Sequence, residues 1–268
     1  MPGSNPQLSA SPSEGRSVLA RGPPVVGIGA SAGGLDALTR LVSALPSNGG
    51  LAYVVVQHLD PTHKSLMGEL LAEHTAMPVL QATDGAIIEP DHIYVIPPGS
   101  NLSVGDGALH LSEPTAPHGA RMPVDFLLNS MAGAYGDRSI AIILSGTGTD
   151  GTLGAKAVHD SGGFVIAQDL AEAEYDGMPK SAIDSGIVDA ILTVAKMPAA
   201  LALHANRINV MVSAKPKVAP NSALPQIIEL IRKNTAHNFT LYKMGTLQRR
   251  IERRMALRSE ERRVGKEC

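Results

Sequence analysis

A serine stands in a short run of small residues near the start of the chain, and its setting suits nucleophilic chemistry. Residues 29–33 read Gly-Ala-Ser-Ala-Gly, a G-x-S-x-G pattern between a predicted strand and a predicted helix. A sharp strand-to-helix turn exposes the serine hydroxyl, and the unpaired N–H groups at the start of the helix point towards developing negative charge. We therefore predict that Ser31 is a catalytic nucleophile.

The same turn allows two other interpretations. Ser31 could be an ordinary helix N-cap in a glycine-rich turn. Residues 27–32 also fit a loose dinucleotide-binding fingerprint, which requires an acidic residue about 20 positions later, at the end of the second strand. That predicted strand ends in Gln57 and His58, so the nucleotide-binding interpretation lacks its acidic residue.

A histidine and an aspartate complete the residue types of a catalytic triad. His58 ends the second predicted strand, and Asp150 follows a predicted strand at residues 140–144. Because parallel strands place their carboxyl ends at one edge of a sheet, we expect Ser31, His58 and Asp150 to lie together. His58 would be the general base, and Asp150 would hold its tautomer. Alternatively, His58 is a structural imidazole and Asp150 is the N-cap of the next helix.

Other histidines provide further alternatives. An α/β-hydrolase has the order serine, acid, histidine, for which His159 or His204 could supply the last residue, but both fall within predicted helices. His58 and His63 could begin a metal site, yet no carboxylate–histidine cluster completes it. We predict neither a metal site nor another cofactor.

The pattern of apolar residues predicts the elements that hold these side chains. Short β-branched runs alternate with patterns of helical spacing, which is typical of βαβ units and of a mostly parallel sheet covered on both faces. The predicted strands are residues 25–29, 51–56, 140–144 and 164–167, and the predicted helices are residues 34–45, 64–74, 151–160 and 192–206. The predicted fold class is therefore α/β, with a doubly wound, mostly parallel sheet.

One insertion interrupts this alternation. Residues 93–96, 101–104 and 108–111 have the pattern of antiparallel strands, with a tight Gly-Asp-Gly turn at residues 105–107. We expect a small antiparallel edge on the sheet at this point.

The composition excludes several classes of protein. The 268 residues carry a formal net charge of -2 and include one cysteine. A single cysteine excludes a secreted domain stabilised by internal disulfides and a zinc site with several cysteine ligands. The near-neutral net charge excludes a protein that binds nucleic acid through an overall basic surface. No apolar run approaches the ~18–20 residues that span a membrane, so we expect no membrane insertion.

Composition also divides the chain into segments. Residues 1–22 are rich in serine and proline and have no apolar stretch, which predicts a disordered leader and not a signal peptide. Residues 207–222 have the composition of a linker. Apolar residues at helical spacing then predict a short all-α fragment at residues 223–257, with one helix largely covered by arginines. That basic surface is either a solvated face or a contact for an acidic partner.

Six short segments together carry a resemblance to a known family. They are Gly-Ile-Gly-Ala-Ser-Ala-Gly-Gly at residues 27–34, Val-Gln-His-Leu at 56–59, Tyr-Val-Ile-Pro-Pro-Gly at 94–99, Leu-Ser-Gly-Thr-Gly-Thr-Asp-Gly at 144–151, Ala-Gln-Asp at 167–169 and Gly-Met-Pro at 177–179. With these segments, residues 23–206 resemble the methylesterase domain of the chemotaxis protein CheB, and most of all the form that is fused to CheR.

The resemblance implies hydrolysis of glutamyl methyl esters on the cytoplasmic helices of chemoreceptors, with release of methanol. Many members of the family also deamidate selected receptor glutamines. The implied protein is cytoplasmic, and its partner is the methylated cytoplasmic domain of a receptor or a similar signalling protein, with no nucleic acid and no cofactor involved. The implied triad is Ser31, His58 and Asp150, the residues already expected at one edge of the sheet.

Further site residues follow from the resemblance alone. Family geometry implies oxyanion donors near the backbone of Ala32 and Thr147, and it implies that Gly177, Met178 and Pro179 lie close to the cleft. Two functions from other classes stay open: a non-catalytic module that docks on receptors, and a nucleotide-binding signalling module.

The C-terminal fragment resembles a second family. Residues 238–255 match the helical N-terminal domain of the methyltransferase CheR, so we expect residues 223–257 to be part of such a domain, whose basic helix faces the acidic receptor. The S-adenosylmethionine-binding domain that should follow is not part of these 268 residues, so no methyl transfer can be claimed for them, and we expect the natural chain to continue into the rest of a CheR-like domain. Residues 258–268 correspond to the translation of a common sequencing adapter, and we interpret them as an artefact. The stand-alone CheB enzyme carries a phosphorylatable receiver domain before its esterase domain. Residues 1–22 are too short to be such a domain, so control by aspartyl phosphorylation on this chain is not supported.

Overall fold

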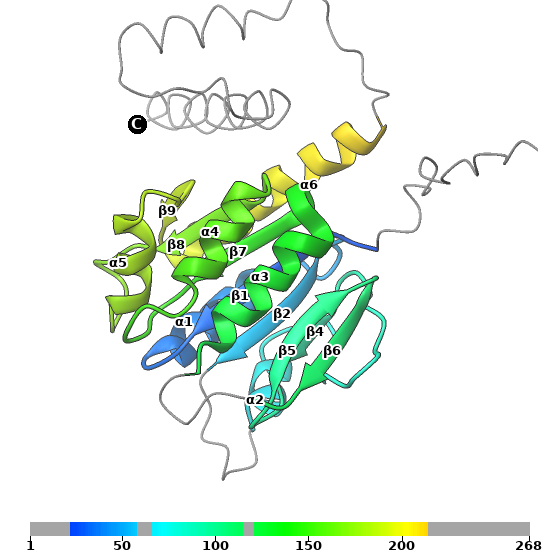
Figure 1. Ribbon diagram of the computed structural model, residues 1–268, viewed down its shortest axis with the longest axis horizontal. Helices are drawn as coiled ribbons and strands as arrows, with labels where there is room; N and C mark the ends of the chain where they lie inside the picture. Colours follow the sequence, from blue (N-terminus) through cyan, green and yellow to red (C-terminus); the bar gives the residue numbers. More distant parts are fainter. Residues whose placement is uncertain (1–21, 58–65, 115–120, 214–268) are drawn as a thin grey trace, which may run out of the picture.

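The computed structural model describes residues 22–57, 66–114 and 121–213 (Figure 1). The strands are β1 (Val25–Ala30), β2 (Ala52–Gln57), β3 (Val79–Gln81), β4 (Ile93–Val95), β5 (Asn101–Gly105), β6 (Ala108–Ser112), β7 (Ser139–Ile143), β8 (Phe164–Gln168) and β9 (Ala190–Leu192). The helices are α1 (Gly34–Ala44), α2 (Met67–Ala72), α3 (Pro123–Tyr135), α4 (Thr152–Asp160), α5 (Gly177–Asp184) and α6 (Met197–Ser213), with 3-10 turns η2 (Gly136–Arg138) and η3 (Val194–Lys196). None of the helices in these ranges has both the length and the apolar character needed to cross a membrane. The predicted leader, except for its last residue, and the CheR-like fragment lie outside the described residues.

Seven strands form one parallel sheet in the order β3-β4-β2-β1-β7-β8-β9. The four central strands consist almost entirely of buried residues, because helices cover both faces of the sheet. β1 pairs with β2 on one side and with β7 on the other, so the carboxyl ends of these three strands meet in the middle of one edge. The predicted α/β fold with a doubly wound, mostly parallel sheet is confirmed.

The expected antiparallel strands are present, but one of the three runs pairs differently. β5 and β6 form a separate two-stranded antiparallel sheet, and Asp106 and Gly107 between them have positive φ angles of 50° and 82°, as a tight hairpin turn requires. The prediction was wrong for β4, which pairs in parallel with β2 and β3. All three residues of β4 are buried, whereas β5 buries only Leu102 and Val104, on alternate positions. Burial on both faces belongs to the parallel sheet.

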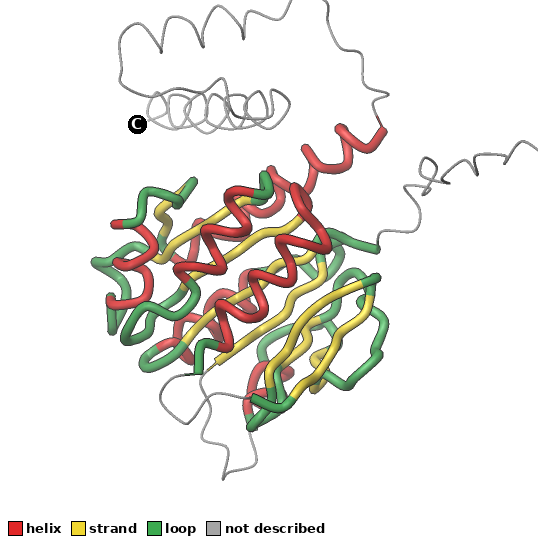
Figure 2. The backbone as a smooth tube through the Cα atoms, in the orientation of Figure 1, coloured by secondary structure: helices red, strands yellow, loops and turns green. Residues whose placement is uncertain are grey.

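Each face of the sheet has its own hydrophobic core. Successive residues of a strand point to opposite faces, so Val54 and Val55 of β2 belong to different clusters of buried side chains. Val55 shares its cluster with Leu41 of α1 and with residues of α2 and α6. Val54 shares its cluster with Leu128 of α3 and with residues of α4, α5 and the hairpin. Figures 1 and 2 show the strands between these two helical layers.

The helices differ in part from those that the sequence pattern predicts. α1 and α4 occupy nearly the predicted ranges, but α6 begins at Met197 and not at residue 192, because the preceding residues form the edge strand β9 and the turn η3. α3 and α5 were not predicted. α3 begins with Pro123 at its first position, where the missing N–H would have no intrahelical acceptor.

Two carboxylates join α3 and α4 at their N-termini. Asp150, in the loop before α4, accepts the N–H groups of Val124 at 3.1 Å and of Asp125 at 2.9 Å, in the first turn of α3. Asp125 Oδ1 in return accepts the N–H of Gly154 in α4 at 2.7 Å. Each carboxylate satisfies helix N-terminal donors that lack an intrahelical acceptor, and the two helices are held in a fixed relative position.

Gly154 allows α3 and α4 to approach closely. A Cβ at this position would lie 2.6 Å from Leu128 Cβ and 2.9 Å from backbone atoms of Asp125. We expect Gly154→Ala to lower the free energy of unfolding by about 1–3 kcal/mol, because the backbone must move. The control Gly133→Ala lies in α3, where a Cβ meets no other atom within 4 Å, and it should raise the free energy of unfolding by about 0.5–1 kcal/mol. Urea unfolding measures both, and a destabilising effect of similar size in the two variants would contradict the close-packing explanation.

The folded protein disfavours the charged form of the Asp125 carboxyl group. Burial raises the pKa of Asp125 above its ordinary 3.8, and the charge of Asp150 adds to this, although the Gly154 N–H acts in the opposite direction. Because the folded pKa is raised, the stability associated with this group is fully present below the unfolded pKa and is lost as the pH rises through the folded pKa. We expect Asp125→Asn, which keeps an oxygen acceptor for Gly154, to gain stability relative to the wild type as the pH rises from about 3 to about 7. Urea unfolding of both proteins across that range tests this, and a difference independent of pH would refute it.

Candidate functional site

The backbone hydrogen bonds between β1 and β7 continue past the ends of both strands. The Leu144 N–H donates to the Gly29 carbonyl at 2.9 Å, and the Ser31 N–H donates to the Ser145 carbonyl at 3.0 Å. Ser31 is therefore positioned by the neighbouring strand as well as by its own turn, at the carboxyl edge of the sheet.

The turn after Ser31 is tight because two glycines form it. Gly33, with a φ of 67°, is the N-cap of α1, and the Gly34 N–H donates back to the Ser31 carbonyl at 2.9 Å. A Cβ at Gly34 would lie 2.7 Å from Ala30 Cβ and 2.8 Å from the Ser145 carbonyl oxygen, so glycine is required there. Since α1 has no side-chain cap, the interpretation of Ser31 as an N-cap is wrong. In the part of the chain that the structure describes, the Ser31 hydroxyl is left available for chemistry.

Ser145 holds the turn from the other side. It is 1% exposed, and its hydroxyl donates to the Ala32 carbonyl at 3.0 Å and accepts the Tyr175 N–H at 3.0 Å. Its own carbonyl accepts the Ser31 N–H. One residue thus fixes the backbone on both sides of the Ser31 side chain.

Gly146 allows the next loop to pass directly beside Ser31. A Cβ at Gly146 would lie 2.9 Å from Ser31 Cβ. Thr147 follows and is exposed, as is Ala32. Within the described ranges, the backbone N–H groups of Ala32 and Thr147 donate to no acceptor. Their role as oxyanion donors stays a prediction.

The start of α5 lies against this loop. The Met178 N–H donates to the Gly146 carbonyl at 2.8 Å, and a Cβ at Gly177 would lie 3.0 Å from the Gly148 nitrogen. Met178 and Pro179 are buried. The structure thus brings Gly177, Met178 and Pro179 to the same loop that passes Ser31, and the backbone between them is closely packed.

Asp150 lies at the end of the same loop and is 4% exposed. It is not the N-cap of α4, because that position is Gly151 and it has no side-chain cap. Its two oxygens instead accept N–H groups at the N-terminus of α3, as described above. These two hydrogen bonds fix the orientation of the carboxyl group. A rigidly held carboxylate is suited to orienting an imidazole.

His58 lies outside the described residues, and so does His63. The residue before His58 is Gln57, which ends β2 in register with Ala30, immediately before Ser31. The role of His58 therefore stays a prediction.

The two alternative histidines lie away from the carboxyl edge. His159 is in the last turn of α4, with Nδ1 3.4 Å from the Oδ1 of Asp160. His204 of α6 stacks on Phe164, the first residue of β8, with ring centroids 4.7 Å apart. Their positions do not support the alternative triad order. Among the described residues there is no group of three or more His, Cys, Asp or Glu side chains arranged to hold a metal ion.

The glycines of the supposed dinucleotide fingerprint have a packing role. A Cβ at Gly27 would lie 2.8 Å from Leu128 Cδ2, and a Cβ at Gly29 would collide with Val124. Both glycines thus make room for α3 on the sheet and do not face a ligand. This packing removes the basis for the nucleotide-binding interpretation.

Sequence reasoning missed the buried polar residues that support the turn. Gln168 ends the apolar strand β8 and is 1% exposed, and its Oε1 accepts the Ser145 N–H at 2.8 Å. Glu172 follows in the next loop and contacts the Gln168 amide at 3.5 Å. The available signal was a polar residue that ends a buried strand at the same edge as Ser31 and Asp150.

Comparisons with known proteins agree with this fold. A family model described as CheB methylesterase matches residues 26–201. A second, described as CheR methyltransferase, all-alpha domain, matches residues 222–259, outside the described residues. The crystal structure of the Thermotoga maritima CheB methylesterase catalytic domain is 34% identical, with a TM-score of 0.62, and the match covers 68% of this chain and 98% of that one.

Curated relatives are longer proteins. The protein-glutamate methylesterase/protein-glutamine glutaminase 2 of Burkholderia lata is 36% identical over 176 residues, which are 65% of this chain and 52% of the relative. An uncharacterized 104.1 kDa protein of Rhodobacter capsulatus is 37% identical over 215 residues, which are 72% of this chain and 22% of the relative. The chain thus spans about half, or less, of the length of these relatives.

The resemblance that the sequence motifs indicated is confirmed. The family match extends over more than half of the chain, and the solved structure shares the sheet and its helical layers. The chain belongs to the CheB methylesterase family.

Proposed function

We propose that this chain is a protein-glutamate methylesterase that hydrolyses glutamyl methyl esters on the cytoplasmic helices of a chemoreceptor, with Ser31, His58 and Asp150 as catalytic residues. The observation that carries the proposal is the Ser31 turn, whose backbone Ser145 holds by hydrogen bonds to Ser31 and Ala32. The Ser31 hydroxyl is available at the carboxyl edge of the sheet, where Asp150 is also held. The printed names of the relatives support the reaction, and the CheR-like match at residues 222–259 supports a receptor-methylation system as the setting.

Acylation begins with attack of Ser31 Oγ on the ester carbonyl carbon. His58 takes the hydroxyl proton as the new C–O bond forms, and Asp150 orients the imidazole and compensates its charge. The negative charge moves to the carbonyl oxygen, where the N–H groups of Ala32 and Thr147 stabilise it. Loss of one such donor typically costs about 10²–10³ in kcat.

Collapse of the tetrahedral intermediate breaks the bond to the methoxy group. Methanol leaves with the proton that His58 carries, and the glutamyl side chain stays attached to Ser31 as an ester. Water then attacks this acyl-enzyme with His58 as the base, and the proton returns to Ser31 Oγ as the free glutamate is released. The same steps on a glutamine amide release ammonia, and the relative's name, protein-glutamine glutaminase, supports that second substrate.

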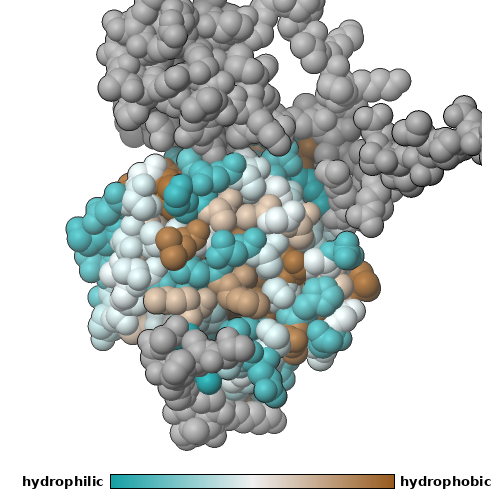
Figure 3. Space-filling model, viewed as in Figure 1, coloured by the Kyte–Doolittle hydropathy of each residue, from teal (hydrophilic) through white to brown (hydrophobic). Residues whose placement is uncertain are grey.

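A protein substrate is favoured by the surface around this edge. Five large apolar side chains there are exposed, in or next to the first turns of α1, α3, α4 and α5: Leu35, Met122, Phe126, Leu153 and Tyr175. Figure 3 shows apolar patches between polar ones over α3 and α4. Such side chains suit contact with the apolar positions of a receptor helix better than with a small free ester.

Replacement of the nucleophile tests the reaction directly. We expect Ser31→Ala to reduce kcat for methanol release from a methylated receptor fragment by about 10⁶-fold, because both the attack and the covalent intermediate are lost. The control is Ser43→Ala, on the exposed side of α1, where the hydroxyl donates only to the Thr39 carbonyl at 2.8 Å. That variant should keep full activity.

The outcome also separates the proposed enzyme from its rival. Full methanol release by Ser31→Ala would disprove the role of Ser31. Binding of the receptor fragment by the wild type, without any release of methanol, would identify a docking module and disprove the esterase.

A further inference from the structure

The position of the Ser31 turn depends on the orientation of one buried amide. Ser145 holds Ser31 and Ala32 only if its own backbone stays in place, and its N–H donates to Gln168 Oε1 at 2.8 Å. Ser145 and Gln168 are both 1% exposed, so water cannot replace this hydrogen bond. A buried N–H that loses its acceptor is unfavourable, so the loop that carries the Ser145 N–H would shift to find another partner.

Glu172 determines which end of that amide faces Ser145. The Gln168 side chain has a donor end and an acceptor end, and its Nε2 faces Glu172 Oε2 at 3.5 Å. An ionised carboxylate accepts hydrogen bonds and donates none, so it attracts the Nε2 end and leaves Oε1 for the Ser145 N–H. A glutamine in place of Glu172 would offer a donor as well as an acceptor, and the Gln168 amide would lose its fixed orientation.

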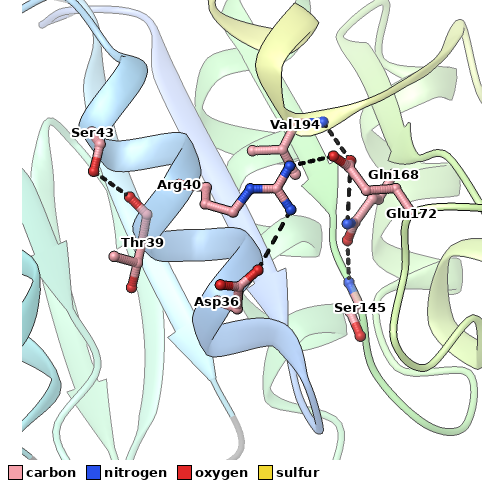
Figure 4. Close-up of polar contacts among 8 residues, drawn as sticks. All are labelled: Asp36, Thr39, Arg40, Ser43, Ser145, Gln168, Glu172 and Val194. Carbon is pink, nitrogen blue, oxygen red and sulfur yellow. Dashed lines mark hydrogen bonds and ion pairs between the residues drawn. The ribbon is translucent and has the colours of Figure 1, made fainter.

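Contacts from two other elements hold Glu172 in place and keep it charged. The Arg40 guanidinium of α1 bonds one oxygen, and the Val194 N–H donates to the other at 2.7 Å. Burial on its own raises the pKa of Glu172, but the Val194 N–H and Arg40 outweigh it, so the pKa lies below the ordinary 4.5. Figure 4 shows the continuous path from Arg40 through Glu172 and Gln168 to Ser145.

We propose that Gln168 and Glu172 are positioning residues of the esterase, which hold the Ser31 turn in its reactive geometry through Ser145. The inference rests on the proposed function, in which Ser31 is the nucleophile. Neither residue touches the reacting atoms. Their effect is on the placement of the hydroxyl and of the Ala32 N–H, so it should appear in the chemical step and leave receptor binding unchanged.

The test compares two carboxylates that share one arginine. Arg40 also contacts Asp36 at 3.5 Å, but the Asp36 side chain is 75% exposed and has no link to Gln168. We expect Glu172→Gln to lower kcat for methanol release by about 10- to 100-fold with KM unchanged, because a shift of about 1 Å in a reacting group costs about 100-fold. The control Asp36→Asn should leave both constants at the wild-type values. Thermal unfolding followed by circular dichroism verifies that each variant is folded at the assay temperature.

Arg40→Met keeps the inference testable if Glu172→Gln does not fold. Arg40 is half-exposed, so its replacement should be tolerated, and the loss of one partner of Glu172 should give a smaller fall in kcat, again with KM unchanged. Wild-type kcat in a folded Glu172→Gln or Arg40→Met would overturn the positioning role and leave the esterase proposal standing. A wild-type protein that releases no methanol would overturn both.

Discussion

The hydrogen bond from the Ser31 N–H to the Ser145 carbonyl is the interaction on which the proposed site depends. It extends the pairing of β1 with β7 beyond the last residues of both strands, at the point where the chain turns into α1. Gly34 and Gly146 lie so close to the opposite strand end and to Ser31 that a Cβ would collide there. The small residues of this motif therefore allow the ends of β1 and β7 to be hydrogen-bonded to each other, and the available Ser31 hydroxyl follows from that contact.

Supporting such a turn requires polar groups inside an otherwise apolar core. Ser145, Gln168 and Asp150 are all nearly inaccessible, and each has partners that satisfy it. The two carboxyl groups lie where backbone donors can bind them: Asp150 at the N-terminus of α3, and Glu172 at the Val194 N–H. The helices consequently have two roles, since they cover the sheet and also fix the loops at its carboxyl edge.

Much of this arrangement could be predicted from the sequence, because its signals are local. β-branched runs indicated the buried strands, and the strand ends indicated that Ser31 and Asp150 lie at one edge of the sheet. β4 was misassigned because a short buried strand next to a hairpin pattern has no local signal for its partner. The link from Gln168 to Ser145 joins residues 23 positions apart through an amide whose orientation depends on Glu172, and no spacing rule predicts it. His58 stays a prediction from the end of β2.

The most direct test is to find which residue reacts with an active-site-directed phosphonate. The intact chain would be treated with a fluorophosphonate, digested, and mapped by mass spectrometry, with methanol release from a methylated receptor fragment measured on the same sample. If Ser31 is the nucleophile, we expect one phosphonyl adduct, on Ser31, and a loss of methanol release in proportion to labelling. An adduct on a different serine, or labelling of Ser31 with methanol release unchanged, would contradict Ser31 as the nucleophile.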